Sequence, residues 1–461
     1  MGARFPLAII ALAAFSLTAR TAPAPPAASL FSSYEVVPIQ LKAPLNDLFE
    51  HARTDEQYVV IGTLSYKDSG RDVTVDGVKV TVRGNTSRRE TECAFPKLKL
   101  ELPAGAMAGA LLTGITALKV GTHCGEATDD NLTAKYGRLP NEQSPLREAF
   151  VYRLLESVGV PTLKARPARV TYVFADGRPG QSPAQEQPVV RNAMLLENTD
   201  KAVKRYGGVR EIEEKAFTNA RAQFSAADTA RVALAEALIG NFDWCLKMTP
   251  TDAYRCNARH PLWNVIAAAA SDGKARPLIY DFDVSGMVAG RHAWFKDTFS
   301  EHFVASGSQT EVEVLAQVQR TRTLFSRTDL DAARADFVKR KPDAYRTLAS
   351  ATIDPAGKRT AQEYLDAFYA AIGSDDAFYR PVVTTPGAQL YANENRAVVC
   401  SSAGAIPVGT PVSGPLQTKG PMIQVHVLDA LWHWAPPAKC AAVREGPVWI
   451  EAAAVSRDFP R

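Results

Sequence analysis

The sequence lacks the motifs that identify several common enzyme classes. It contains no GxSxG motif of serine hydrolases and no HExxH motif of zinc peptidases, and its seven histidines form no cluster with ligand spacing. It also lacks a GxGxxG phosphate loop, and none of its six cysteines belongs to a CxxC pair. A serine hydrolase, a zinc peptidase and a structural zinc site therefore have no positive signal.

The sequence also has no dense block of basic charge. Its 53 Lys and Arg against 49 Asp and Glu give a net charge of +4 spread along the chain, which gives little support to nucleic-acid binding. Its 461 residues allow two or three domains, and 46% apolar with 22% charged residues is an ordinary globular composition.

Long apolar runs are absent except at the start of the chain. There a single Arg precedes an apolar run too short to span a bilayer comfortably, followed by a Pro- and Ala-rich stretch. This pattern predicts a secretory signal and linker over residues 1–28, and hence a secreted or periplasmic protein without stable membrane insertion. An uncleaved anchor is disfavoured because positive stop-transfer residues are sparse.

The six cysteines are few but informative, because their number is even and they fall into three local pairs. Sequence alone does not fix the connectivity. Pairing of nearest neighbours, as Cys93–Cys124, Cys245–Cys256 and Cys400–Cys440, fits an oxidising compartment and respects domain order.

The first part of the body alternates in the manner of β-strands. Alternation predicts strands within 56–66 and 73–84, with Asp76-Gly77 as a hairpin turn. A further strand over 96–102 points Lys97 and Lys99 to one face. Strands are also expected at 168–177, 192–200, 262–270 and 275–283.

Helical periodicity dominates later stretches. Residues 144–160 predict a helix with Ser144 as N-cap, Pro145 in the first turn and Gly159 as its end. Residues 224–244 predict a second helix, and more follow beyond residue 310. The body over 34–380 thus reads as an α+β fold, in which a β-rich lobe and a mostly helical lobe flank an expected cleft.

The last part of the chain differs from the body in its residue pattern. Residues 386–461 predict short strands punctuated by Gly and Pro, and we interpret them as a separate small all-β domain whose core is supplemented by Cys400–Cys440. Its stretches GAQLYANENRAVV, IPVGTPV and GPVWIEAAAVS resemble a bacterial SH3-like barrel.

Six stretches of the body, in order, resemble the landmarks of the CotH kinase-like family, across roughly residues 55–290. They are RGNTSR (83–88), PKLKLEL (96–102), SPLREAFVYRLLESVGV (144–160), AMLLENTD (193–200), GNFD (240–243) and LIYDFDVSG (278–286). The family has an atypical protein-kinase-like fold, manages without GxGxxG, and includes secreted or spore-coat phosphotransferases. The resemblance implies a two-lobed kinase-like body that uses ATP with Mg²⁺ or Mn²⁺.

The resemblance also implies roles for individual residues. Asp281 matches a metal-binding acid at a strand end, with Asp283 as a second metal candidate, and the amide oxygen of Asn264 would complete the shell. Asp243 matches a catalytic-loop aspartate that would accept or orient the acceptor hydroxyl or take part in metal binding, and Lys97 matches the lysine that contacts phosphate.

Further cofactor-binding candidates follow from the same matches. Lys99 shares the face of Lys97, Arg83 flanks the polar turn, and Glu197 lies at the expected connection between the lobes near an adenine. Of Arg83 and Arg88, at least one is expected to form a structural ion pair. Glu148 either pairs with the lysine, as in ordinary kinases, or is an exposed helix residue.

Each site residue has a structural alternative. Asp283 is equally consistent with a turn or helix-cap residue. Asp243 is consistent with a polar cluster that ends a helix together with Asn241, and Asn264 with a residue that hydrogen-bonds the backbone at a strand start. Lysines are also common on solvated edge strands.

Two functions therefore stay open. One is a secreted, ATP- and metal-dependent phosphotransferase acting on a protein or cell-envelope substrate. The other is a catalytically inactive kinase-like scaffold that binds cell-wall or protein ligands, with Trp432, Trp434 and Trp449 of the SH3-like domain offering aromatic surface for a peptide or glycan. The segment of twenty residues between Asp243 and Asn264 is longer than the catalytic loop expected from the resemblance. It would either control substrate access to the cleft or fill the cleft and abolish activity.

Overall fold

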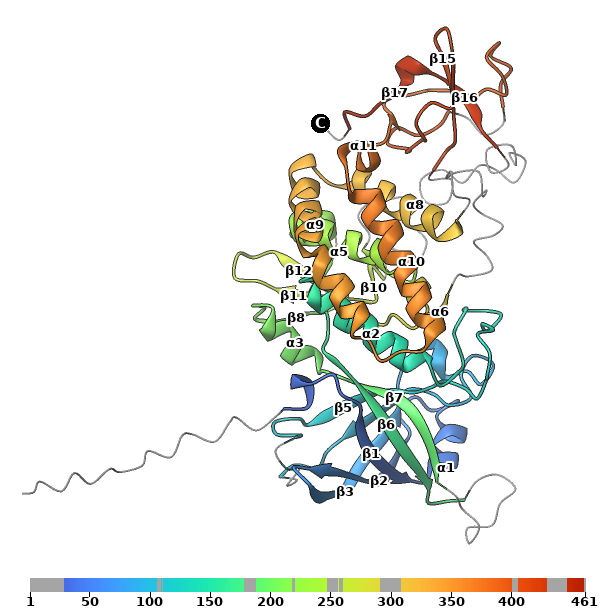
Figure 1. Cartoon of the computed structure of the whole chain (residues 1–461). Coiled ribbons are helices and arrows are strands. Elements are labelled where there is room, and N and C mark those ends of the chain that lie inside the picture. Colours follow the sequence, from blue (N-terminus) through green and yellow to red (C-terminus); the bar gives the residue numbers. More distant parts are fainter. Residues whose placement is uncertain are drawn as a thin grey trace, which may run out of the picture.

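The structure is a computed structural model that describes residues 29–105, 109, 111–177, 188–217, 220–246, 256, 260–290, 308–399, 405–428 and 446–459. Strands form a lobe at one end, helices fill the middle, and short strands lie at the other end (Figure 1). The predicted α+β class is confirmed. The signal segment, the Cys400–Cys440 pair, Trp432 and Trp434 lie outside the described residues.

Seven strands of the first lobe close into a barrel in the order β1-β2-β3-β4-β5-β7-β6. Neighbouring strands run antiparallel, except that β1 and β6 pair in parallel and so close the barrel. The strands are β1 Val37–Ala43, β2 Val59–Asp68, β3 Arg71–Val82, β4 Leu98–Glu101, β5 Ala117–Gly121, β6 Ala165–Phe174 and β7 Val189–Leu196. Their alternating apolar side chains fill the interior, which leaves the polar alternates on the outer surface.

The predicted hairpin turn at Asp76-Gly77 is wrong. Strands β2 and β3 are joined at Ser69 and Gly70, which both have positive φ (51° and 82°). Asp76 and Gly77 lie inside β3, where the register to β2 shifts and Asp76 accepts a hydrogen bond from the Thr63 hydroxyl at 2.8 Å. An Asp-Gly pair suits a bulge as well as a turn, since both need a residue at positive φ.

The helices lie mainly in the middle of the molecule (Figure 1). The longer ones are α1 Leu45–His51, α2 Ser144–Ser157, α3 Thr199–Arg205, α5 Ala226–Leu238, α8 Gln309–Leu324, α9 Arg327–Ala349 and α10 Pro355–Ile372. The short ones are α4 Ala220–Gln223, α6 Gly286–Ala289 and α11 Asp375–Phe378, and 3₁₀ turns occur at Leu30–Ser32, Thr86–Arg88, Glu214–Ala216 and Ala452–Ala454. Among the described residues, no helix combines the length and apolar character needed to span a bilayer.

Two helix ends differ from the prediction: α5 ends at Leu238, six residues before the predicted end at 244, and α2 begins one residue early. The side chain of Ser225 caps α5, and Gly159 with φ 75° follows the end of α2 as predicted. Ser144 is not the N-cap of α2: that place is taken by Gln143, and Ser144 is already helical, with Pro145 in the first turn. The helix therefore begins one residue earlier than predicted, and the N–H of its N-cap residue donates to Asn141 Oδ1 at 2.9 Å.

A small sheet in the helical lobe carries the loops that matter most. It contains β8 Arg210–Ile212, β11 Val265–Ala269 and β12 Ala275–Ile279, and beside it β9 Cys245–Leu246 pairs with β10 Leu262–Trp263. The predicted strand over 262–270 is interrupted at Asn264, which has φ 54°. The predicted strand over 275–283 ends at Ile279, so Asp281 and Asp283 lie in the loop that follows it.

Tyr364 of α10 packs against two of these loops at once. It is buried (1% exposed), its hydroxyl donates to Glu313 at 2.6 Å, and its ring lies against Gly240 and Gly286. The Gly286 N–H also donates to the Gly240 carbonyl at 2.9 Å. The loops before Asp243 and after Asp281 are thus held together by one aromatic side chain.

The last part of the chain contains two small sheets over a separate hydrophobic cluster. Strand β13 Val382–Val383 pairs with β17 Val455–Ser456, and β14 Gln417–Lys419, β15 Met422–Val425 and β16 Val448–Glu451 form a three-stranded sheet. Within the residues that the structure describes, these sheets do not form a closed barrel. The SH3-like domain over 386–461 stays a prediction.

Replacing Gly286 with Ala should destabilise the protein, because the new methyl group would meet the rigid Tyr364 ring. We expect a loss of about 1–3 kcal/mol in the free energy of unfolding, the usual range for overpacking. Gly414→Ala is the matched control, since its methyl group would enter open space. Chemical denaturation of both variants measures the difference, and equal stabilities would contradict the packing role of Tyr364.

Candidate functional site

A cavity of about 520 Å³ lies where the barrel meets the small sheet of the helical lobe. Its charged and amide-bearing lining residues are Arg83, Asn85, Lys97, Lys119, Arg138, Glu211, Glu214, Asp243, Asn264 and Asp281. Its other lining residues are Gly84, Thr86, Ser87, Ile212, Leu262, Trp263, Val265, Ala267 and Tyr280. The cavity is therefore rich in cations on the barrel side and in acids on the other side.

Five of the predicted site residues meet at this cavity although they are far apart in sequence. Asp243, Asn264 and Asp281 reach it from loops of the helical lobe, and Arg83 and Lys97 reach it from the barrel. Lys99, Asp283 and Glu197 are not part of its lining.

Lys97 connects the two lobes. It precedes β4, whose Leu98 and Leu100 point into the barrel, so alternation turns Lys97 outward to the cavity. Its Nζ lies 2.5 Å from Asp281 Oδ1 and 2.8 Å from Asp283 Oδ2, and the residue is 5% exposed. A buried lysine with two carboxylate partners is not a solvated strand residue.

Helix α2 fixes the backbone at Asp281, which has a φ of 67°. The Asp281 N–H donates to the Tyr152 hydroxyl at 2.9 Å, and the Phe282 N–H donates to Glu148 Oε1 at 3.2 Å. Phe282 is fully buried against the Tyr152 ring, at 4.7 Å between centroids. Glu148 therefore holds this loop; it is buried rather than an exposed helix residue, and no hydrogen bond or salt bridge joins it to Lys97. Burial raises its pKa.

Asp281 stays ionised despite its surroundings. Burial acts to raise its pKa, but the nearby positive charges of Lys97, Arg138 and Arg83 outweigh this and lower the pKa to about 2. One carboxylate oxygen binds Lys97, so the charge is held in a fixed place beside the cavity.

Asp283 lies behind Lys97 and is itself buried (9% exposed). Arg138 contacts its carboxylate and also donates to the Thr86 hydroxyl at 2.5 Å. Asp283 is thus shared by two cations, an arrangement that favours a role in fixing Lys97 and the 83–88 turn over a role as metal ligand.

Asn264 and Asp243 form one hydrogen-bonded unit. Asn264 Nδ2 donates to the Asp243 carbonyl at 2.6 Å and to its Oδ2 at 3.1 Å, and Trp263 Nε1 donates to Oδ1 at 3.2 Å. The positive φ at Asn264 turns its side chain back toward Asp243, and Oδ1 is the remaining acceptor of its amide.

Two of the cations at the cavity were not predicted. Lys119 lies opposite Lys99 in the β4–β5 register, and its burial, together with the nearby Arg83 charge, lowers its pKa. Alternation within 117–121 would have placed it on the outer face of the barrel. Arg138 comes from a loop without regular periodicity, so no sequence signal identifies it.

Among the described cations that line the cavity, Arg83 has buried N–H groups that no protein acceptor binds. Its Nε and Nη2 are buried and have no hydrogen-bond partner within the described part of the chain. Buried donors of this kind are normally satisfied, and a guanidinium with free donors at a cavity wall is suited to an anionic oxygen. Arg88, by contrast, donates to the Gly84 carbonyl at 2.7 Å and shapes the turn.

Glu197 and Lys99 have partners elsewhere. Glu197 is 6% exposed, binds Arg205 at 2.6 Å and accepts from the Lys164 N–H at 3.0 Å, so it closes the end of the β6–β7 pair. Lys99 pairs with the exposed Glu101. Both residues were expected to contact the cofactor, but neither lines the cavity.

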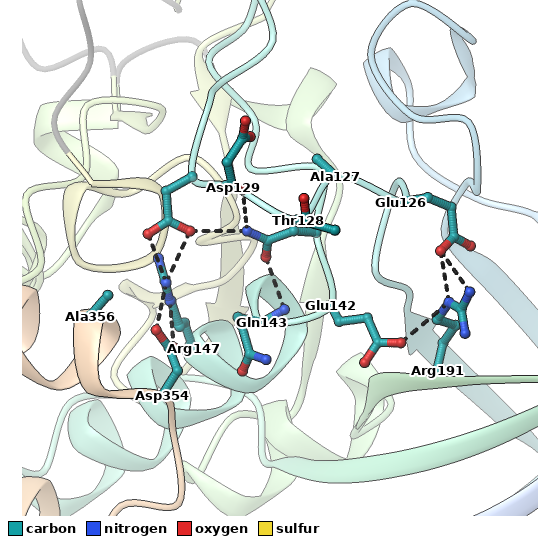
Figure 2. A pocket seen from close by; sticks show the side chains of 12 residues that line it. Glu126, Ala127, Thr128, Asp129, Glu142, Gln143, Arg147, Arg191, Asp354 and Ala356 are labelled. Atoms are coloured by element: carbon teal, nitrogen blue, oxygen red, sulfur yellow. Dashed lines mark hydrogen bonds and ion pairs between the residues drawn. The ribbon is translucent and has the colours of Figure 1, made fainter.

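A second cavity of about 720 Å³ has acidic residues in its lining, and several of these already form ion pairs with arginines. Figure 2 shows Arg191 between Glu126 and Glu142, and Arg147 beside Asp354. Arg147 Nη2 lies 2.8 Å from Asp354, and Arg191 Nη2 lies 2.8 Å from Glu126. Because these carboxylates are already bound by guanidinium groups, we interpret this cavity as a structural junction between the barrel, α2 and α10.

The oxygen donors at the first cavity suit a hard divalent cation. Within the described residues, no group of three or more His, Cys, Asp or Glu side chains could hold a metal ion by itself. Asp281 and Asn264 line the same cavity and carry a carboxylate and an amide oxygen, the ligand types that Mg²⁺ uses alongside water and phosphate oxygens.

Two of the three predicted disulfides are confirmed, and each lies near one side of the cavity. Cys93–Cys124 joins the position four residues before Lys97 to the segment just after β5, so the loop that it closes contains Lys97 and both strands β4 and β5. Cys245–Cys256 lies two residues after Asp243, with Cys245 paired to Trp263 across β9 and β10. Both therefore restrain the segments that carry the site.

Comparisons with known proteins give little further information. No protein-family model and no curated protein matches the chain. Among solved structures it is similar to the Helicobacter pylori proinflammatory kinase CtkA, at 8% identity and a TM-score of 0.32, over 59% of this chain and 90% of that chain. At that identity and TM-score the likeness assigns neither a fold nor an activity.

The low pKa of Asp281 predicts a specific dependence of stability on pH. A carboxyl whose pKa falls from 3.8 in the unfolded chain to about 2 in the fold stabilises the fold above pH 4, and this is lost as the pH falls through 2. The wild type should exceed Asp281→Asn by about 2 kcal/mol in unfolding free energy at neutral pH, and the gap should narrow between pH 4 and 2. Denaturant titrations at several pH values test this, with Glu101→Gln as the control for an exposed carboxylate beside a lysine. A gap that stays constant with pH would contradict the ion pair.

Proposed function

We propose that the chain is an ATP- and divalent-metal-dependent phosphotransferase of an atypical kinase-like class, acting on a protein or cell-envelope substrate outside the cytoplasm. The observation that carries the proposal is the convergence of Asp243, Asn264, Asp281, Lys97 and Arg83 on one cavity between the lobes. Phosphoryl transfer requires little else from a protein than a held metal, cations on the phosphates and a carboxylate near the acceptor.

The two sides of the cavity divide these tasks. Asp281 and Asn264 would hold Mg²⁺ or Mn²⁺, which neutralises phosphate charge when bound. Lys97, Lys119 and the uncompensated donors of Arg83 line the same cavity and would bind phosphate oxygens. Ile212, Val265 and Ala267 give the cavity an apolar wall against which a nucleotide base can pack.

Asp243 is the residue suited to the acceptor. Its carboxylate is oriented by Trp263 and Asn264 and would accept the proton of the attacking hydroxyl. The hydroxyl oxygen forms a bond to the γ-phosphorus while the bond from that phosphorus to the β–γ bridging oxygen breaks. ADP leaves with the electron pair of the broken bond, and the products are ADP and a phosphate monoester.

Export is supported by the same residues that frame the site. The two disulfides are typical of an oxidising compartment, in agreement with the signal expected over 1–28. In the alternative, the cavity is inherited without activity and the last part of the chain, predicted to be SH3-like, binds a cell-wall or protein ligand.

Lys97 and Lys99 provide a matched pair of variants for a binding test, because they share a strand face but only Lys97 lines the cavity. We expect ATP with Mg²⁺ or Mn²⁺ to raise the melting temperature of the wild type and of Lys99→Met. The shift should be lost in Lys97→Met and in Asp281→Asn, because these lack a phosphate contact and a metal ligand.

Transfer itself is measured with labelled ATP on the purified mature protein, with casein and cell-envelope fractions as acceptors. Asp243→Asn should bind ATP with metal as the wild type does but lower transfer at least about 100-fold, the usual contribution of a positioned base. Absence of any nucleotide-dependent shift in the wild type would instead favour the scaffold.

A further inference from the structure

We infer that Glu236, a residue outside the cavity, positions Asp243 by holding the side chain of Asn241. The inference rests on the proposed function for its catalytic consequence, but its structural part is testable without activity. Glu236 lies in the last turn of α5, and both Glu236 and Asn241 are completely buried.

A short chain of hydrogen bonds connects the three residues. Asn241 Nδ2 donates to Glu236 Oε2 at 2.9 Å, and the Asn241 N–H donates to the Glu236 carbonyl at 2.9 Å. At the other end, Asn241 Oδ1 accepts the backbone N–H of Asp243 at 2.9 Å. The end of α5 is thus tied to the residue that would serve the acceptor.

The direction of the Asn241 amide matters for this connection. An Asn side chain presents oxygen on one side and NH₂ on the other, and only the oxygen can accept from the Asp243 N–H. Glu236 supplies the acceptor that the NH₂ requires in a fully buried position. Without it, that NH₂ would be left unsatisfied or the amide would turn over and lose its bond to Asp243.

Among the residues that the structure describes, no cation forms a salt bridge with Glu236 or lowers its pKa. Within the described residues, its carboxyl group makes one hydrogen bond, the one from Asn241 Nδ2 to Oε2, and its Oε1 has no partner there. Burial raises its pKa well above the ordinary value, and the negative charge of Asp243 raises it further. A neutral carboxylic acid can accept the Asn241 bond through its carbonyl oxygen without adding a second buried negative charge near Asp243.

The first experiment compares Glu236→Gln with Glu236→Leu. The Gln variant keeps an oxygen acceptor of the same shape, so we expect wild-type transfer, whereas the Leu variant should lower kcat at least tenfold. Both should keep the wild-type KM for ATP and the full thermal shift with ATP and Mg²⁺, because neither changes the cavity lining. Unchanged kcat in the Leu variant, or an equal loss in the Gln variant, would overturn the inference.

The second experiment needs no activity and separates this inference from the proposed function. Above pH 4.5 the unfolded chain releases the Glu236 proton while the folded chain keeps it, so rising pH favours unfolding. Relative to Glu236→Gln, the unfolding equilibrium constant of the wild type should rise tenfold per pH unit until the folded group ionises. Parallel pH profiles of the two proteins between pH 5 and 8 would contradict a buried, neutral Glu236 in contact with Asn241, even if the wild type transfers phosphate.

Discussion

The contact between Lys97 and Asp281 is the interaction on which the site depends. It joins the barrel to the loop after β12 across the cavity, and Asp283 and Arg138 complete the charge cluster. Buried ion pairs contribute little net stability because desolvation offsets their attraction. Their value here is positional: the cluster keeps a carboxylate ionised at the cavity while α2 fixes its backbone through Tyr152. The barrel, α2 and the small sheet are thus arranged around one charged contact.

Sequence periodicity predicted the elements of the fold better than their connections. The alternating strands and the long amphipathic helices appear as expected, because burial of one face determines their type. The turn at Asp76-Gly77 was misplaced because positive φ is required in a bulge as well as in a hairpin. The strand expected over 262–270 is broken by Asn264 at positive φ, a tertiary effect driven by its bonds to Asp243 and invisible in the local pattern.

The sequence identified those cavity residues that match a position of the CotH kinase-like family, and it did not identify the others. Asp243, Asn264 and Asp281, which the resemblance singled out, line the same cavity, and their roles there stay predictions. Lys119 and Arg138 were missed because they lie on a short strand and in an irregular loop, where only the closed barrel brings them to the cavity. Glu197 lies at the expected connection but is bound by Arg205, a partner that a linear sequence does not reveal.

The positions of the two disulfides have a practical consequence for anyone preparing this protein. One cross-link closes a loop that contains Lys97 and Lys119, and the other closes a loop that begins two residues after Asp243. Material synthesised in the reducing cytoplasm of an expression host would carry four free thiols at these places, and neither cross-link would then restrain its loop in the unfolded chain. Export to an oxidising compartment or oxidative refolding is therefore part of making the molecule, and thiol titration belongs beside every assay of it.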